Sequence, residues 1–377
     1  MTAKPLTAKQ LTAKQHCLAV CAPGVEQVCA SELGGLGIRI RRAFRGGVEF
    51  SASDRELYNT NVWLRTATRI VVRVAQFEAG GFGELERHAQ EVPWERWVAP
   101  GSRPQVRATS TSSRLYHTGA IEERLADVAG SGDEAGLLLV ARVIHGRVTL
   151  SIDSSGAPLY QRGWRLESAK APLRETLAAA ILLASGWDRE SPLADPMCGS
   201  GTIPIEAALL AAGLPPGAGR TFAFQEWPSF QPGTWASVWA AAAEATAADR
   251  PVPRITGSDR DAGAVGAAAA NATRAGVADL VDFRTASLSA ASPVWVDDGA
   301  TAPGWLITNP PYGRRVGAGS DLRDLYATLG RVAREHFGGW RVGLLAADTR
   351  LAGHTGLALE ERLRTENGGV SVKFLVA

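Results

Sequence analysis

The second half of the chain alternates between short apolar runs and longer helix-like runs, and this alternation restricts the fold more than any other feature. Helices are predicted from TLAAAILLASGW, GTIPIEAALLAAG and AGAVGAAAANATRAGV, and strands from PLADP, PRITGSD, LVDFRTAS, GWLITN and RVGLLAAD. Strands linked by helices pair in parallel, so we expect an α/β fold with a doubly wound sheet. The last run, LALEERLRTENGGVSVKFLVA, predicts an antiparallel hairpin about Asn367-Gly368.

The first 160 residues have a different pattern, with several short strands and few helices. HCLAVCAPGVEQVCASELGGLGI predicts a strand, a turn and a helix, and LLLVARVIHGRVTLSIDSSG predicts two strands joined at His145-Gly146. We therefore expect two small α+β units here. Residues 1–15 repeat Thr-Ala-Lys and lack the apolar centre of a signal peptide, so we interpret them as a disordered leader and expect a cytoplasmic location.

Composition and charge exclude some classes of protein. The 377 residues are 45% hydrophobic and 21% charged, with no apolar run as long as a membrane span. Residues 1–165 hold 21 Lys and Arg against 16 Asp and Glu, whereas the rest holds 19 against 22. A mildly basic front favours a polyanion-binding part. The four cysteines form no CxxC pair, so we expect buried thiols and no metal site. The tryptophans at 227, 235 and 239 are predicted to pack rather than to bind a ligand.

A glycine loop, DPMCGSGT, spans Asp195–Thr202 between a predicted strand and a helix. It lacks the Gly-Lys-Ser/Thr of a P-loop and the third glycine of a dinucleotide fingerprint. A ligand with a ribose but no pyrophosphate suits such a loop at the sheet edge. Asp259 ends the next strand, in GSDRD, where a carboxylate can accept from both ribose hydroxyls.

The run LITNPPYG, residues 306–313, ends a buried strand with two prolines, an aromatic residue and a glycine. Neither proline has an N–H to extend a ladder, and a residue before proline is held in extended geometry. The segment is therefore stiff and leaves carbonyls and the Asn309 amide free to bind. We interpret it as a site for a flat polar group with N–H donors; the alternative is a proline turn without chemistry.

Three stretches, DPMCGSGTIPIEAALLAAG, GSDRDAGAVGAAAANATRAGV and TNPPYGRRVG, together resemble S-adenosylmethionine-dependent RNA methyltransferases. The front resembles their THUMP-containing RNA-binding region in APGVEQVCASELGGLGI, NVWLRTATRIVVRVAQF, VRATSTSSRLYHTGAIEERL and LYQRGWRLESAKAPLRETLAAAILLASGW. The guanine-N2 enzymes of tRNA are the most similar group, followed by the 23S rRNA enzymes. The resemblance implies a Rossmann-like class I methyltransferase sheet at 161–377, where a terminal hairpin is usual, preceded by a ferredoxin-like subdomain at 16–70 and a THUMP domain at 71–160.

The resemblance also implies S-adenosylmethionine as the cofactor. The residues that it assigns to cofactor binding are Asp195, Cys198, Gly199, Ser200, Gly201, Thr202, Asp259, Arg260, Ser287 and Asn309. In the family an Asp often follows the third strand and meets the adenine amino group. In this chain the run RTASLSA puts Ser287 at that place.

The resemblance implies that the flat group is a nucleobase with an exocyclic amine, and that Asn309, Pro310 and Tyr312 are the catalytic residues. The Asn309 side-chain oxygen and the Pro310 carbonyl accept the two N–H bonds, and Tyr312 stacks on the ring. The amine then becomes more pyramidal and its lone pair meets the sulfonium methyl group. Positioning and preorganised dipoles supply the catalysis, and no strong base is needed. A paired base must first be flipped out.

The partner implied is RNA, with tRNA preferred and rRNA second, and we expect no membrane or metal. Candidate RNA contacts are Arg107, Arg114, His117, Arg124, Arg314 and Arg315. The alternatives are methylation of adenine N6 or of a protein glutamine, because the Asn-Pro-Pro-Tyr motif reads an NH₂ group and not one base, or a catalytically inactive RNA-binding protein. The basic front argues against a protein acceptor, and the presence of Asn309, Asp259 and both glycines argues against inactivity.

Overall fold

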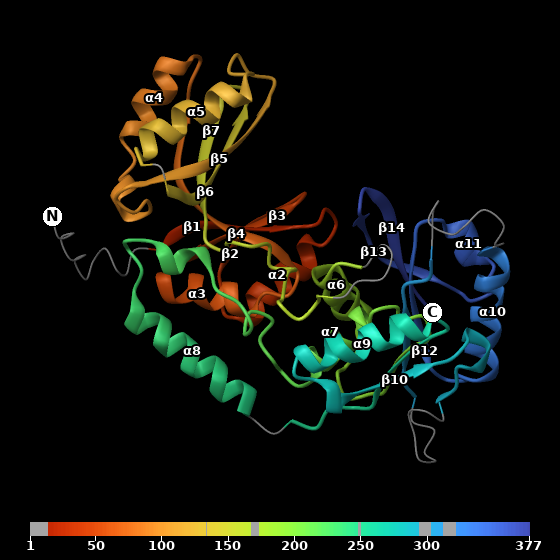
Figure 1. Ribbon diagram of the computed structural model, residues 1–377. Coiled ribbons are helices and arrows are strands. Elements are labelled where there is room, and N and C mark those ends of the chain that lie inside the picture. The colour runs from red at the N-terminus through yellow and green to blue at the C-terminus, as the bar shows by residue number, and fades with distance from the viewer. Residues whose placement is uncertain (1–13, 133, 167–172, 248–249, 294–302, 312–321) are drawn as a thin grey trace. The chain divides into compact units, whose positions relative to one another are not determined.

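The computed structural model describes residues 14–132, 134–166, 173–247, 250–293, 303–311 and 322–377. The chain forms two compact units (Figure 1). The first unit comprises Met1–Cys21, Ala30–Leu159 and Arg220–Ala241, and the second comprises Ala22–Cys29, Tyr160–Gly219 and Ala242–Ala377. The sequence predicts one continuous domain over 161–377, whereas segment 220–241 groups with the first unit.

The first unit is built on a seven-stranded sheet with the order β2-β3-β1-β4-β7-β6-β5. The elements of residues 14–159 are β1 (Gln15–Cys21), α2 (Glu26–Gly35), β2 (Ile40–Phe44), β3 (Gly47–Ala52), α3 (Asp54–Trp63), β4 (Ala67–Glu78), α4 (Phe82–Gln90), the 3₁₀ turn η1 (Trp94–Arg96), β5 (Ser102–Thr111), α5 (Thr118–Ala129), β6 (Glu134–Ile144) and β7 (Arg147–Asp153). The later segment adds the 3₁₀ turn η2 (Ala223–Glu226) and the first part of α8 (Pro232–Ala247).

Strand β4 joins what the sequence predicts as two separate α+β units. Its first part pairs with β1 and its second part with β7, both antiparallel, so the sheet is continuous. A single strand of 12 residues can do this because β1 and β7 lie along its two opposite edges, and residues 71–73 pair with both. A bulge between Arg73 and Ala75 shifts the register of the pairing with β7. The predicted turn between β6 and β7 is confirmed: His145 and Gly146 have φ of 51° and 83°, as a two-residue hairpin turn requires.

Helix α3 contacts β3, α5 packs on β5, and α4 packs on α5. The residues beneath them form a buried cross-strand row of apolar side chains: Phe50, Cys17, Val72, Ile152 and Leu139. Their direct register partners share that face because side chains alternate along a strand. All four cysteines are free and buried, as predicted.

The aromatic residues of segment 220–241 pack against α3. Phe224 stacks on Tyr58 with ring centroids 4.3 Å apart, and Trp235 meets Phe224 edge-on at 5.3 Å. Trp227 is 5% exposed, and Trp239 lies against Trp235 but is 37% exposed. Packing is therefore what these tryptophans do in the structure, as the sequence predicts, and it explains why the segment joins the first unit.

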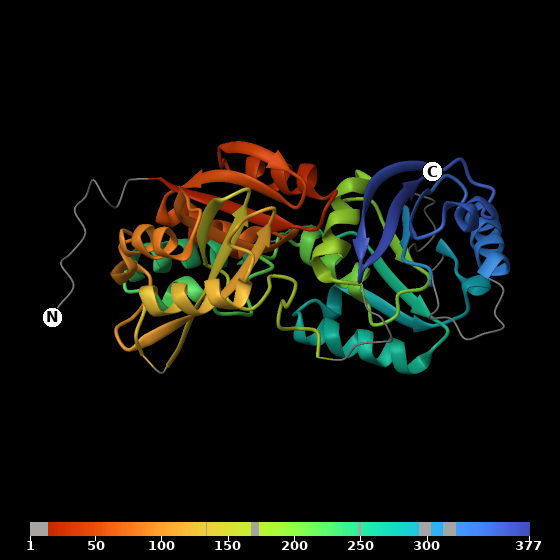
Figure 2. The same ribbon diagram turned by 90° about the horizontal axis from the view of Figure 1, so that it is seen from above.

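The second unit contains a second seven-stranded sheet, of order β10-β9-β8-β11-β12-β14-β13. Its elements are α6 (Glu175–Ser185), β8 (Leu193–Asp195), α7 (Thr202–Ala211), β9 (Ile255–Asp259), α9 (Ala262–Arg274), β10 (Val281–Thr285), the 3₁₀ turn η4 (Leu288–Ala290), β11 (Trp305–Thr308), α10 (Leu322–Glu335), β12 (Arg341–Ala346), α11 (Thr349–Gly353), β13 (Glu360–Asn367) and β14 (Val370–Val376). Figure 2 shows α7 and α9 on one face of this sheet and α10 on the other.

The five strands β10, β9, β8, β11 and β12 are parallel to one another. Strand β14 pairs antiparallel with β12 and with β13, so the predicted doubly wound sheet with a terminal hairpin is confirmed. The hairpin turns one residue later than predicted, at Gly368-Gly369, where both φ angles are positive. No helix in the described ranges is long and apolar enough to cross a bilayer. Within those ranges there is also no group of three or more His, Cys, Asp or Glu side chains arranged to hold a metal ion.

Candidate active site

Three neighbouring parallel strands, β9, β8 and β11, bring the predicted site residues to one edge of the second sheet. They end at Asp259, Asp195 and Thr308, respectively. Asp195 pairs in register with Gly257, and Leu306 pairs with Ala194. Since the carboxyl ends of parallel strands share one edge, the glycine loop after β8 and the Asn-Pro-Pro segment after β11 start side by side.

A side-chain hydrogen bond connects these two segments. The Thr308 hydroxyl donates to Asp195 Oδ1 over 2.6 Å, and the Met197 N–H donates to the same oxygen over 3.1 Å. Asp195 is 2% exposed and Thr308 is fully buried. The residue that precedes Asn309 is thus tied to the first turn of the glycine loop.

The backbone N–H groups of the loop are almost all satisfied by the protein. Cys198 donates to the Ser258 carbonyl, Gly199 to Asp259 Oδ2 at 3.0 Å, and Gly201 to the Cys198 carbonyl. Over the described residues, the Ser200 N–H has no acceptor. Between Met197 and Gly201, Ser200 therefore keeps its donor available for a ligand, held between groups that are already fixed.

The two glycines of the loop have different roles. At Gly201, with φ of 83°, an added Cβ would lie 2.9 Å from both the Ala268 Cβ and the Phe283 ring, so no side chain fits. At Gly199, with φ of 53°, an added Cβ would meet nothing within 4 Å. Gly201 is needed for close packing on α9, whereas the space at Gly199 is open, as a loop that receives a ligand requires.

Two polar side-chain atoms at this edge are buried and unused. Neither Asn309 Oδ1 nor Ser258 Oγ has a hydrogen-bond partner among the residues that the structure describes. A buried acceptor without a partner is costly, and such atoms are expected where a ligand completes the bonding. Pro310, which follows Asn309, is also buried. The donor at Ser200 and the Asp259 carboxylate fit a ligand that carries hydroxyls and a carboxylate, and the acceptor at Asn309 fits an amine.

Burial raises the pKa of Asp195 to about 7, and the nearby charge of Asp259 adds to this effect, whereas the bonds from Thr308 and Met197 oppose it. Burial also raises the pKa of the Cys198 thiol well above its usual value, with the charges of Asp195 and Asp259 adding to it. Cys198 therefore remains a thiol and is no nucleophile.

We expect Asp195→Asn to flatten the pH dependence of stability. An unfolded Asp loses its proton near pH 4, whereas the folded protein keeps it until about pH 7. The wild type therefore loses stability as pH rises through this window, by on the order of 2–4 kcal/mol. Urea unfolding of both proteins between pH 4 and pH 8 measures the difference, with Asp282→Asn, at an exposed position of β10, as the control. Equal slopes for wild type and Asp195→Asn would contradict the assignment.

The other predicted site residues are less closely gathered. Ser200 and Thr202 are buried at the start of α7, whereas Arg260 is exposed. Ser287 follows β10 and is exposed, and its hydroxyl lies 3.0 Å from that of Ser289. The predicted residues Tyr312, Arg314 and Arg315 lie outside the described residues.

Sequence reasoning missed several residues that support this edge: Thr308, Ser258, Asn271 and Arg165. A hydroxyl at Thr308, at the end of the apolar strand GWLIT, was the available signal. The role of Asn271, which donates from Nδ2 to the Ser200 carbonyl over 3.1 Å, had no signal in the local pattern because the two residues are 71 positions apart.

The candidate RNA contacts of the first unit differ in availability. Arg107 is exposed and has no partner within the described residues. Arg124 is held by an ion pair with Glu86 and lies over the Phe82 ring. The His117 ring packs on Tyr116, which is 67% exposed. Arg114 lies in the same loop before α5.

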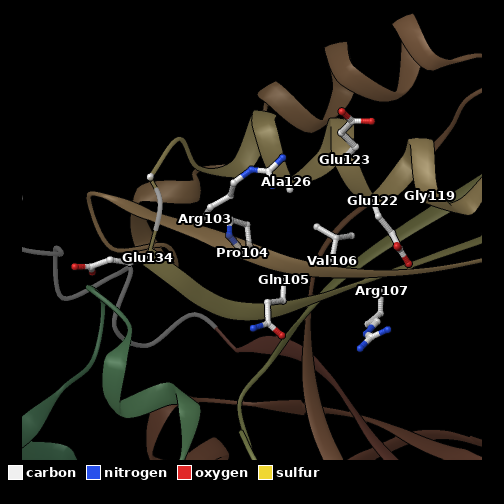
Figure 3. A pocket seen from close by; sticks show the side chains of 11 residues that line it. Arg103, Pro104, Gln105, Val106, Arg107, Gly119, Glu122, Glu123, Ala126 and Glu134 are labelled. Atoms are coloured by element: carbon white, nitrogen blue, oxygen red, sulfur yellow. The ribbon is translucent and has the colours of Figure 1, made fainter.

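A cavity of about 710 Å³ lies between β5 and α5 in the first unit. Its charged lining residues are Arg103, Arg107, Glu122, Glu123 and Glu134. Figure 3 shows the Glu122 and Glu123 carboxylates on the α5 side, whereas Gln105 and Arg107 point away from α5. Glu122 Oε1 accepts from the Ala108 N–H at 2.8 Å, which satisfies a backbone donor of the edge strand β5. This cavity holds none of the predicted cofactor residues.

A doubly wound sheet with this terminal hairpin and these three loops in order defines an α/β methyltransferase domain. Two family models match the chain: "UPF0020: RMKL-like, methyltransferase domain" over residues 162–373, and "RlmL ferredoxin-like domain" over residues 16–71. The chain belongs to the UPF0020 family, with a ferredoxin-like domain before its Rossmann-like methyltransferase sheet.

The chain is similar to named proteins over nearly all its length. It is 34% identical over 376 residues to the ribosomal RNA large subunit methyltransferase K/L of Syntrophotalea carbinolica, covering 95% of this chain and 52% of that one. It is 31% identical over 371 residues to slr0064 of Synechocystis sp., covering 95% of each. The crystal structure of SMU.472 complexed with SAH matches with a TM-score of 0.87 and 29% identity, covering 97% of this chain and 98% of that one. The chain spans about half the length of the K/L relatives that it matches.

Proposed function

We propose that the chain is an S-adenosylmethionine-dependent RNA methyltransferase that modifies the exocyclic N2 amine of a guanosine. The observation that carries this proposal is the buried, unpartnered Asn309 Oδ1, next to a glycine loop to which its strand is tied through Thr308 and Asp195. An acceptor for an amine thus lies beside a loop suited to a nucleoside-containing cofactor.

The residues of the loop edge fit the cofactor. Asp259 accepts from the Gly199 N–H with Oδ2 and from the Asp261 N–H with Oδ1, and each oxygen keeps a lone pair for a ribose hydroxyl. The Ser200 N–H is a donor for the carboxylate of the cofactor. When bound, S-adenosylmethionine supplies the methyl group on a positively charged sulfur. The SMU.472 structure with SAH supports this part of the proposal.

Asn309 and Pro310 perform the catalytic work on the acceptor. Asn309 Oδ1 and the Pro310 carbonyl accept the two N–H bonds of the amine and orient its lone pair. The conjugated lone pair becomes available only as the nitrogen becomes pyramidal, so these bonds strengthen towards the transition state. Because Asn309 Oδ1 is already desolvated, it requires no reorganisation when the amine arrives. The amine loses its proton after transfer, so no residue needs to act as a strong base.

The face of the first sheet that α3, α4 and α5 leave uncovered is the surface we propose for RNA. One cross-strand row on it consists of His16, Arg73, Ser151, Val140 and Arg107, and the next consists of Gln76, Thr149, Arg142 and Thr109. Arg73 pairs with Glu49 at 2.7 Å. Arg107 and Arg142, on adjacent strands, are exposed and have no partner among the described residues. Two free guanidinium groups on an open sheet suit phosphate contacts.

We expect the double variant Arg107→Ala/Arg142→Ala to bind folded RNA more weakly and with a smaller salt dependence. Each lost phosphate contact removes about 0.7–0.9 from the slope of log K against log salt, so the loss should be about 1.4–1.8. Anisotropy titrations across a salt series measure it. Arg103→Ala, in which the lost side chain is paired with Asp127 on α5, is the control and should bind as the wild type does. An unchanged slope in the double variant would move the RNA surface elsewhere.

The assignment of residues 71–160 as a THUMP RNA-binding domain and the cytoplasmic location are parts of the same proposal. The sequence favours tRNA as the acceptor, whereas the name of the K/L relatives supports large-subunit ribosomal RNA. Incubation with methyl-labelled S-adenosylmethionine and total cellular RNA and protein tests the proposal. We expect label that ribonuclease releases and protease does not; label in protein alone would overturn it.

A further inference from the structure

A network of polar side chains holds the glycine loop in place, and none of these side chains takes part in the proposed reaction. Asn271 on α9 is fully buried, and its Nδ2 donates to the Ser200 carbonyl over 3.1 Å. Its Oδ1 accepts from Arg274 Nη2 at 2.5 Å, and Arg274 Nε donates to the Trp164 carbonyl at 2.9 Å. Asn271 thus connects the loop to a backbone segment more than 30 residues earlier in the chain than the loop itself.

A second connection reaches the residue after the loop. Arg165 Nη2 donates to the Thr202 hydroxyl at 2.8 Å and to the Leu173 carbonyl at 2.6 Å. Arg165 is also within 3.3 Å of the Glu175 carboxylate, and both side chains are largely buried. We call Arg165, Asn271 and Arg274 the loop clamp. These residues bond to the loop on the side where Gly201 packs on Ala268. Ala268 lies one turn before Asn271 in α9.

The consequence for the loop follows from its peptide planes. The Ser200 carbonyl and the Gly201 N–H belong to one plane, and both are bonded, to Asn271 and to the Cys198 carbonyl. The Gly199 N–H belongs to the plane two positions earlier and is bonded to Asp259. The plane between them, which carries the Ser200 N–H, is flanked by two anchored planes. Its donor has no acceptor among the described residues.

We propose that Asn271 is a positioning residue: by anchoring the Ser200–Gly201 plane it preorganises the Ser200 N–H to bind the carboxylate of the cofactor's amino-acid part. This inference rests on the proposed function. Ser200 is the group that touches the cofactor, and Asn271 acts through it. Fixing a donor before the ligand arrives removes an ordering cost from binding.

The test compares two ligands that differ at the carboxylate. SAH carries the amino-acid part, whereas 5′-methylthioadenosine lacks it. Asn271→Leu has nearly the same size and introduces no charge, but it cannot donate to Ser200. Calorimetry on the full chain should give an affinity for SAH about tenfold weaker than that of the wild type, and an affinity for 5′-methylthioadenosine within about twofold. In turnover, KM for S-adenosylmethionine should rise by a similar factor with kcat nearly unchanged.

The possible results separate a failure of the proposed function from a failure of the inference about Asn271. If the wild type does not bind SAH, the proposed function fails and not only the inference. If the wild type binds and Asn271→Leu binds SAH equally well, or loses both ligands equally, Asn271 has no positioning role. Should Asn271→Leu fail to fold, Arg274→Gln breaks the same chain of bonds at an exposed residue and should show the same ligand selectivity. Thr273→Ala, an exposed neighbour on α9, is the control and should change neither affinity.

Discussion

Replacing Asn309 by alanine is expected to slow methyl transfer to RNA by on the order of 10²–10³, equivalent to about 2–4 kcal/mol of transition-state stabilisation. The side-chain oxygen that is lost is buried and has no partner within the described residues, so its desolvation is already paid when the amine binds. The effect should appear in kcat, because the bond strengthens only as the nitrogen becomes pyramidal. Single-turnover transfer of labelled methyl groups to RNA measures it.

Two comparisons separate this role from general damage. The affinity of Asn309→Ala for SAH, measured by calorimetry, should stay close to that of the wild type, because the oxygen acts on the acceptor. Asn309→Asp keeps an acceptor at the same place and should retain a larger share of the rate than Asn309→Ala. Near-native turnover of Asn309→Ala would remove Asn309 from the mechanism.

Replacing Asp259 by alanine is expected to weaken the binding of S-adenosylmethionine about 10–100-fold, or by roughly 1.5–3 kcal/mol. A carboxylate that accepts from ribose hydroxyls is lost, and so is the acceptor that holds the Gly199 N–H at 3.0 Å. Asp259→Asn keeps an oxygen for Gly199 but not the charge, so its affinity should lie between those of the wild type and Asp259→Ala. Isothermal calorimetry with SAH measures all three affinities.

Asp261 provides the matched control for this prediction. It lies two residues further on and caps helix α9, accepting from the Gly263 N–H at 2.8 Å and the Ala264 N–H at 3.3 Å. Asp261→Ala should therefore lower stability by about 1 kcal/mol and leave the affinity for SAH nearly unchanged. The reverse result, in which Asp261→Ala loses affinity for SAH and Asp259→Ala keeps it, would show that Asp261 and not Asp259 holds the ribose.

The elements that could be predicted from the sequence are those fixed by local chemistry. The parallel strands of the second sheet are short apolar runs between turn residues, and the final hairpin has a Gly-Gly turn. The continuous first sheet could not be predicted, because it depends on β4 pairing with two strands far apart in the chain. The same holds for segment 220–241, whose place is decided by Phe224 stacking on Tyr58, 166 residues earlier.

The site divides in a similar way. Asp195, Gly199, Gly201, Asp259 and Asn309 could be singled out because glycines, an acid and an Asn-Pro-Pro run follow predicted strands, and the structure brings these residues to one edge. The residues that hold them could not be singled out. Thr308, Asn271 and Arg165 are ordinary residue types whose roles depend on bonds to distant positions. A local sequence pattern therefore indicates the residues that take part in the chemistry better than it indicates the residues that hold them in place.

The most direct test of the central claim is the identity of the methylated nucleoside. The full chain is incubated with methyl-labelled S-adenosylmethionine and RNA, both tRNA and large-subunit ribosomal RNA, and the RNA is digested to nucleosides and separated. We predict label in N2-methylguanosine, and on the order of 10²–10³-fold less of it when Asn309→Ala replaces the wild type at matched reaction times. Label in N6-methyladenosine, or no label in RNA from a wild-type protein that binds SAH, would contradict the account.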